Sequence, residues 1–264
     1  MKDKSVAYVN VSCANIYRDP TFRCEVNSQV ILWEKLEIID KKNDFFLVKT
    51  EDQYKGWINL YQIILLDELP NYDTALIMER QVYFYNKPDN CSEIVRDGFV
   101  GIHVPVLSNK DGWIETKFPD GTKGWIEKKK TGRINEVSRN KIIKYASTFL
   151  GIAYLWGGKT VQGFDCSGYV QFIHKMFGLN IRRDAWMQFE DSQFVSKDPI
   201  EGDVGDLLFF SEDEKKISHV GFFLKPGFLL HCKGMVKIES LVKKNRLFNE
   251  KILKDFVEIR TFLN

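Results

Sequence analysis

The sequence predicts an α+β C-terminal domain preceded by two small β-barrels. One observation is a repeat, since Lys-Gly-Trp-Ile occurs at 55–58 and again 68 positions later, at 123–126. The other is a change of pattern after about residue 131, where helical spacing comes first and apolar, strand-like runs follow. Helices followed by strands are typical of an α+β domain with segregated layers. We therefore expect three domains, at 1–66, 67–130 and 131–264.

Each copy of the repeat ends a strand–turn–strand pattern. Apolar residues alternate over 44–50 and again over 111–116, which indicates half-buried strands, and Phe-Pro-Asp-Gly at 118–121 is a hairpin turn signal. In the Gly-Trp pair, the glycine relieves crowding at a strand bend and the tryptophan covers the end of a barrel. Tandem copies at domain-sized spacing indicate tandem β-barrels.

The third domain opens with two predicted helices. Ser138 is a candidate N-cap of a helix through Leu150, which Gly151 would end. A second helix follows from Cys166 to Phe177, with Gly178 after its last turn. Beyond Pro199, the apolar runs around 207–210, 219 and 231 are predicted strands.

Composition describes an ordinary globular protein, with 44% hydrophobic and 28% charged residues and a net charge of +2. This charge gives no electrostatic reason to expect nucleic acid or an acidic membrane surface as a partner. Lys128–Lys130 is interpreted as a solvated linker. Five scattered cysteines without a CxxC pair favour a reducing compartment, and MKDKSVAYVN lacks an apolar signal segment, so we expect a cytoplasmic protein. Nothing indicates the oligomeric state.

Chemistry is predicted at Asp-Cys-Ser-Gly, residues 165–168, where a glycine-rich stretch gives way to a helix. The first turn of a helix offers unpaired N–H groups and a positive dipole end, which both favour a thiolate at Cys166. His219 and His231 lie in strand-like runs downstream. One cysteine and two histidines on strands are the parts of a thiol hydrolase. The remaining histidines are interpreted as structural: His103 and His174.

Order and context make these residues a compound motif. Tyr-x-Trp-Gly-Gly at 154–158 is followed by Cys-Ser-Gly, Gly-Asp-Leu-Leu-Phe-Phe, Ser-His-Val-Gly and a further histidine. Over 135–264 the chain resembles the NlpC-type cell-wall cysteine peptidases, which have a papain-like fold. The resemblance implies that Cys166 is the nucleophile, His219 its base and His231 the group that orients His219. It also implies that the Tyr154 hydroxyl lies near the oxyanion, helped by the Cys166 backbone N–H.

The two repeats resemble bacterial Src-homology-3-like domains, and the three-domain order resembles the γ-D-glutamyl-L-diamino acid endopeptidases. This resemblance implies that Asp165, Asp19 and Tyr54 bind the ammonium of a free N-terminal L-alanine, with aspartate at 19 where the family more often has glutamate. Ser167 and Asp184 would complete the groove around L-Ala-γ-D-Glu. The alternative for Asp165 is that it only N-caps the cysteine helix.

The function implied is hydrolysis of the γ-D-Glu–diamino acid bond in free murein peptides, as part of peptide recycling. The diamino acid is either meso-diaminopimelate or L-lysine, and neither a metal nor an organic cofactor is expected. Three alternatives remain open at this point. They are hydrolysis of polymeric peptidoglycan, a wall-binding role with an inactive catalytic domain, and acyl transfer from the same thioester.

Overall fold

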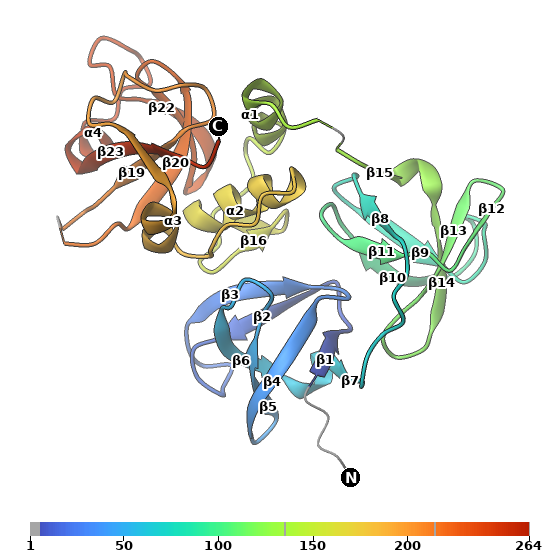
Figure 1. Ribbon diagram of the computed structural model, residues 1–264. Helices are drawn as coiled ribbons and strands as arrows, with labels where there is room; N and C mark the ends of the chain where they lie inside the picture. The colour runs from blue at the N-terminus through green and yellow to red at the C-terminus, as the bar shows by residue number, and fades with distance from the viewer. Residues whose placement is uncertain (1–5, 135, 214, 264) are drawn as a thin grey trace. The chain divides into compact units, whose positions relative to one another are not determined.

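A computed structural model describes residues 6–134, 136–213 and 215–263 of the chain. The chain divides into two compact units, Met1–Arg133 and Ile134–Asn264 (Figure 1). The first five residues, where the first predicted domain begins, lie outside the described residues. Within the described residues, no helix has the length and apolar character needed to cross a membrane.

The first half of the N-terminal unit is a strongly curved antiparallel sheet with strand order β3-β2-β6-β5-β4-β1-β7. The elements are β1 (Val6–Val9), β2 (Cys13–Tyr17), β3 (Val26–Ile31), β4 (Lys35–Lys42), β5 (Phe45–Lys49), β6 (Lys55–Asn59), the 3₁₀ turn η1 (Leu60–Gln62) and β7 (Ile63–Leu65). Its core is aliphatic and includes Ile16, Val48 and Ile58. A Cβ on Gly56 would lie 2.4 Å from Ile16 Cγ2, which confirms that glycine relieves crowding in the repeated motif.

The second half of this unit contains a five-stranded sheet, β10-β9-β14-β13-β12, and a three-stranded sheet, β11-β8-β15. The elements are β8 (Thr74–Ile77), β9 (Val82–Tyr85), β10 (Ile94–Gly98), β11 (His103–Pro105), β12 (Ser108–Lys110), β13 (Trp113–Lys117), β14 (Lys123–Glu127), the 3₁₀ turn η2 (Lys128–Lys130) and β15 (Thr131–Gly132). The predicted turn joins β13 to β14, where the Gly121 N–H donates to the Phe118 carbonyl at 2.9 Å.

The lysine run at 128–130 is solvated as predicted, because Lys128 and Lys129 are exposed, but it is not a linker. It forms η2, and the Glu127 carboxylate pairs with Lys129 at 2.7 Å and Lys130 at 2.8 Å. β15 follows directly and pairs with β8. The run is therefore part of the second β-rich domain, while the exact domain boundaries at 66 and 130 stay predictions.

Trp33 joins the two β-rich halves of the N-terminal unit. Its ring stacks on Phe118 with centroids 5.2 Å apart, and its indole N–H donates to the Lys117 carbonyl at 3.1 Å. The Arg96 guanidinium also packs on the Phe118 ring, 4.4 Å from its centroid, and pairs with the Asp120 carboxylate at 2.8 Å. Because of these contacts, the two β-rich halves, which the sequence predicted as separate barrels, pack together as one unit.

The C-terminal unit is built on a six-stranded antiparallel sheet, β18-β23-β19-β20-β21-β22, with a small β16–β17 ribbon and, in its described residues, four helices (Figure 1). The helices are α1 (Arg139–Ser147), α2 (Cys166–Met176), α3 (Ala185–Asp191) and α4 (Glu250–Asp255). The strands are β16 (Lys159–Thr160), β17 (Gly163–Phe164), β18 (Gln193–Ser196), β19 (Leu207–Phe210), β20 (His219–Lys225), β21 (Phe228–Lys233), β22 (Met235–Ser240) and β23 (Phe256–Thr261).

Helix α2 packs against β20 and β21, the strands that begin with or contain the two candidate histidines. Tyr169 and His174 of α2 both contact the Phe222 ring of β20. A separate apolar cluster of this unit joins β19, β20, β21, β23 and α4 and includes Leu208, Phe223 and Ile259. Apolar packing on α2 thus fixes the helix that carries Cys166 relative to both histidine strands.

The predicted helix boundaries are close to those observed. Ser138 caps α1 by accepting the Lys141 N–H, but the helix ends at Ser147, three residues before the predicted Leu150. α2 starts at Cys166 and Phe177 is its C-cap, with Gly178 at φ +78°, as predicted. The predicted α+β architecture agrees with the structure: a unit with its first helices before its main antiparallel sheet follows two β-rich domains.

Candidate active site

Cys166 is the first residue of α2, and the residue before it is the N-cap. The Asp165 carboxylate accepts the Gly168 N–H at 2.6 Å, which closes the first turn of the helix. A Cβ on Gly168 would lie 2.1 Å from the Gly158 carbonyl oxygen, so glycine is needed where the Gly157–Gly158 loop packs on the helix. The two glycine motifs of the sequence therefore meet at the turn that presents Cys166.

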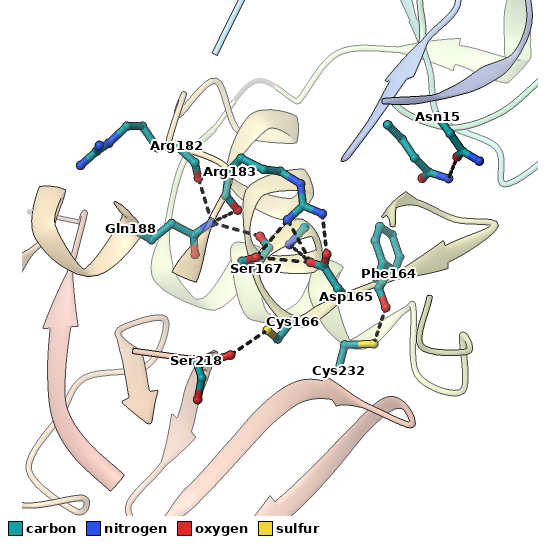
Figure 2. Close-up of polar contacts among 12 residues, drawn as sticks. Asn15, Phe164, Asp165, Cys166, Ser167, Arg182, Arg183, Gln188, Ser218 and Cys232 are labelled. Carbon is teal, nitrogen blue, oxygen red and sulfur yellow. Dashed lines mark hydrogen bonds and ion pairs between the residues drawn. The ribbon is translucent and has the colours of Figure 1, made fainter. Parts of the chain in front are cut away.

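The thiol of Cys166 lies at the start of β20. Sγ is 3.9 Å from the Ser218 carbonyl oxygen, and the Val220 N–H also interacts with the sulfur (Figure 2). Since Ser218 and Val220 flank His219, the structure places the Cys166 thiol beside the backbone on both sides of His219. Both Cys166 and His219 are 8% exposed.

The two histidines are directly joined. His219 Nε2 lies 2.8 Å from His231 Nδ1, and their rings are nearly perpendicular at 81°. A glycine makes room for this pair, because a Cβ on Gly221 would lie 2.6 Å from the His231 Cβ. His231 is fully buried. The third predicted member of the triad thus touches His219 through the ring nitrogen that leaves His219 Nδ1 available for Cys166.

The ionisation of Cys166 differs from its prediction. Burial, and then the negative charge of Asp165, raise the pKa of the thiol to about 12, although the Val220 and Ser167 N–H groups and Arg183 oppose this rise. Desolvation of the thiolate therefore outweighs the favourable helix terminus. Burial and the adjacent His231 also hold the pKa of His219 well below its usual value. The resting pair is a neutral thiol beside a neutral imidazole.

Arg183 is the functional residue that the sequence interpretation missed. Its guanidinium, 1% exposed, contacts both carboxylate oxygens of Asp165, at 3.0 Å and 2.5 Å, and donates to Ser167 Oγ at 2.9 Å (Figure 2). Ser167 and Asp165 therefore meet, but in a buried network with Arg183. The only sequence signal for this partner was the Arg-Arg-Asp run next to Asp184.

The Gln188 side chain holds the Arg183 segment against α2. Its Nε2 donates to the carbonyls of Ser167 at 3.0 Å and Arg182 at 2.9 Å (Figure 2). Asp184, at the N-cap position of α3, is half-buried, and its pKa is raised by burial and by Asp165 while Arg183 opposes the rise. Asp184 therefore lies in the electrostatic neighbourhood of the Asp165–Arg183 pair, and its place in a substrate groove stays a prediction.

Tyr154 also belongs to this neighbourhood. Burial, followed by the electrostatic influence of the acidic groups of Cys166 and Asp165, raises the pKa of the phenol. Its backbone N–H donates to the Gly234 carbonyl at 2.9 Å, which ties the loop before Cys166 to the end of β21. A protonated phenol near the sulfur is able to donate to an oxyanion, the role predicted for Tyr154.

Two predicted binding residues belong to the N-terminal unit. Asp19 is exposed and pairs with Arg18 at 3.0 Å, while Tyr54 is half-buried and its carbonyl accepts the Thr50 N–H at 3.0 Å. Their roles stay predictions. Among the described residues, no group of three or more His, Cys, Asp or Glu side chains is arranged to hold a metal ion.

Comparison with known proteins places this site in a family. The NlpC/P60 family matches residues 151–256. A relative from Bacillus cereus (strain ATCC 10987 / NRS 248), named gamma-D-glutamyl-L-lysine dipeptidyl-peptidase, is 26% identical over 84% of this chain and 71% of its own length. A relative of the same name from Bacillus subtilis (strain 168) is 26% identical over 86% of this chain and 79% of its own.

A solved structure gives the same assignment of fold. The crystal structure of an NlpC/P60 family protein from Bacillus cereus ATCC 10987 has a TM-score of 0.84 and 23% identity, and the match covers 98% of this chain and 100% of that one. The family match identifies residues 151–256, which carry Cys166, His219 and His231, as an NlpC/P60 domain, and two β-rich domains precede it.

Proposed function

We propose that this protein is a cysteine endopeptidase that hydrolyses the γ-D-Glu–diamino acid bond of murein peptides with a free N-terminal L-alanine. The observation that carries the proposal is the meeting of Cys166, at the start of α2, with the joined pair His219 and His231. Two similar proteins named for γ-D-glutamyl-L-lysine dipeptidyl-peptidase activity support the choice of substrate.

The geometry supports catalysis through a thioester. Cys166 Sγ attacks the γ-carbonyl carbon of D-glutamate as its proton passes to His219 Nδ1. The C–N bond then breaks, and His219 returns the proton to the departing amine of the diamino acid. Water attacks the thioester through the same base, which releases L-Ala-D-Glu and restores the thiol. His231 stabilises the imidazolium that forms on His219 at each step.

The oxyanion and the amino end of the substrate bind to groups close to Cys166. The Tyr154 hydroxyl and the Cys166 backbone N–H donate to the oxyanion. Ser167 and Asp184 contact the L-Ala-γ-D-Glu backbone. Asp165, whose carboxylate also pairs with Arg183, binds the substrate ammonium.

The proposal is tested with four synthetic peptides. L-Ala-γ-D-Glu-L-Lys and L-Ala-γ-D-Glu-meso-diaminopimelate are each compared with an N-acetylated twin, and products are followed by mass spectrometry. We expect L-Ala-D-Glu from one or both free-amine peptides and little from the twins. Cys166→Ala should abolish turnover, whereas the exposed Cys91→Ala should not change it.

Each other result points to a different function. Equal cleavage of free and acetylated peptides would contradict the ammonium contact and favour polymeric peptidoglycan as substrate. Transfer of L-Ala-D-Glu to an added amine, in place of release, would make the reaction acyl transfer. No cleavage of any peptide would favour a wall-binding role. Free wall peptides as substrate also accord with our proposal of a cytoplasmic recycling enzyme.

A further inference from the structure

His231 has a second neighbour on the side away from His219. Glu239, on β22, places Oε2 at 3.0 Å from His231 Nε2, and its side chain is only 14% exposed. The approach is oblique, so the attraction is that of a carboxylate for an N–H group rather than a straight hydrogen bond. Strands β21 and β22 are paired, with Lys237 opposite His231 and Glu239 opposite Leu229.

The carboxylate of Glu239 is itself held in place. Oε1 lies 2.8 Å from Lys237 Nζ, and Oε2 accepts the Asn249 Nδ2–H at 3.1 Å. Burial would raise the pKa of Glu239, but the contacts with His231, Lys237 and Asn249 outweigh it and lower the pKa to about 2. Glu239 is therefore ionised at neutral pH and can only accept hydrogen bonds.

An ionised acceptor 3.0 Å from His231 Nε2 favours one arrangement of protons on the two histidines. With the His231 proton on Nε2, facing Glu239, a neutral His231 has a bare Nδ1. His219 Nε2, 2.8 Å away, must then carry the proton between the rings. The remaining nitrogen of His219, Nδ1, is bare and can accept the proton of Cys166.

We propose that Glu239 is a positioning residue that fixes the tautomers of His231 and His219, so that the base presented to Cys166 is unprotonated. The role rests on the proposed function for Cys166 and His219. The other charged groups around the two rings are Lys233 of β21 and Lys237 of β22, which both disfavour a proton on either histidine, whereas Glu239 favours it. Glu239 thus also stabilises the imidazolium that forms when the thiol is deprotonated.

Two substitutions distinguish the effect of the hydrogen-bond acceptor at Glu239 from the effect of its negative charge. Glu239→Gln keeps an oxygen that can face His231, whereas Glu239→Leu has similar volume and no acceptor. We expect Glu239→Leu to lower kcat roughly 10- to 100-fold with KM changed less than about 3-fold, and Glu239→Gln to retain most of the activity. The matched control is Glu258→Gln, which removes a similarly buried glutamate paired with Arg260 on β23.

A second readout does not need turnover. Long-range ¹H–¹⁵N spectra of histidine-labelled protein should show His231 as a single Nε2–H tautomer in the native protein and in Glu258→Gln. The same spectra should show mixed tautomers in Glu239→Leu, with far-ultraviolet circular dichroism unchanged. An Nδ1–H tautomer for His231 in the native protein would overturn the proposal, as would Glu239→Leu with native kcat.

The two readouts keep this inference distinct from the proposed substrate. If the native protein cleaves no murein peptide but shows the Nε2–H tautomer of His231, the function fails and the role of Glu239 in the tautomer stands. If it cleaves the peptide but His231 carries its proton on Nδ1, the function stands and the role of Glu239 is wrong.

Discussion

Asp165, the residue before Cys166, makes two structural contacts. It caps α2 through the Gly168 N–H, and it forms a buried ion pair with Arg183. The first contact agrees with the alternative interpretation of Asp165 as an N-cap. The second neutralises a charge that otherwise opposes a thiolate at Cys166. Arg183 is thus the reason that an acidic residue is tolerated next to a catalytic cysteine.

Breaking this pair on one side should be costly. Asparagine is as good an N-cap as aspartate, so Asp165→Asn isolates the ion pair from the cap. We expect Asp165→Asn to lower the free energy of unfolding by about 3–5 kcal/mol, because it leaves the Arg183 charge buried and unpaired. Adding Arg183→Met should recover a large part of this loss. Urea unfolding of the two variants measures it, and equal stability of Asp165→Asn and the native protein would contradict it.

The same substitution should make the thiol more reactive. Asp165 raises the pKa of Cys166 and Arg183 lowers it, so Asp165→Asn removes the first influence and leaves the second. The thiolate fraction at pH 8 should rise, and alkylation of Cys166 by iodoacetamide should become faster. Asp203→Asn is the control, since Asp203 lies in the same unit, before β19, and its backbone N–H donates to Asp206. An unchanged alkylation rate would show that Asp165 does not govern the thiol.

The buried side chain of His174 should make the free energy of unfolding depend on pH. Its Nδ1 faces the Val170 carbonyl at 2.8 Å, its buried Nε2 has no hydrogen-bond partner among the described residues, and burial lowers its pKa from 6.5 to about 4. Between about pH 4 and pH 6.5, His174 is therefore protonated in the unfolded chain and neutral in the folded chain. This contribution to stability is complete above pH 6.5 and is lost as the pH falls from 6.5 to about 4.

Replacing His174 should remove that part of the pH dependence. The loss is on the order of 3 kcal/mol across this range, from the size of the pKa change. We expect His174→Leu to flatten the decline in unfolding free energy between pH 7 and pH 4, whereas the exposed His103→Asn should leave it unchanged. Denaturant unfolding at several pH values measures the slope. The same slope in His174→Leu as in the native protein would exclude His174 as its source.

At the scale of elements, the sequence predicted the helices and strands that have a regular local pattern of apolar residues. The helical spacing after Cys166 and the Gly178 stop gave α2, and the apolar runs gave β19, β20 and β21. β22, α4 and β23 were not predicted, because charged residues interrupt their apolar pattern. Glu239 and Arg183 were missed for a related reason: each acts through a partner that is distant in sequence, and pairing across strands or loops leaves no local signal.

Gly221 links the pairing of two strands to the position of His231. The β20–β21 pairing sets Gly221 opposite His231, and an added Cβ would lie 2.6 Å from the His231 Cβ. We expect Gly221→Ala to displace the His231 ring and lower kcat at least about 10-fold, because the contact with His219 depends on its position. Some loss of stability, about 1–3 kcal/mol, should accompany it.

A matched glycine separates the two effects. A Cβ on Gly202 would also be crowded, 3.0 Å from Phe223 Cδ2 and 3.1 Å from Ile259 Cδ1, but these are ring and methyl atoms in the apolar cluster. Gly202→Ala should therefore lose stability and keep kcat within about 2-fold. Peptide hydrolysis and urea unfolding of both variants give the comparison. Native kcat in Gly221→Ala would show that catalysis tolerates a displaced His231.

At the scale of the whole molecule, the two β-rich domains share a core contact that neither repeat encodes. Trp33 lies in the turn after β3, with φ +66°, and its ring packs against both Phe84 and Phe118 of the second domain, which also contact each other. A bulky residue at positive φ is strained, and packing on the second domain compensates for it. The repeated Gly-Trp motif predicted two barrels, but only the structure shows that they form one unit.

This contact should make the two domains unfold together. Trp33→Ala removes the stacked ring and its hydrogen bond to Lys117, and we expect a cost of about 3–5 kcal/mol in the N-terminal unit. Hydrogen exchange under increasing denaturant, read by mass spectrometry on peptides from β5 and β13, should show one transition in the native protein. The same experiment on Trp33→Ala should show two, because the domains lose the ring that couples them. Tyr61→Ala, at a 78% exposed position, should keep the single transition. A single shared transition in Trp33→Ala would mean that Arg96 and its partners suffice to couple the domains.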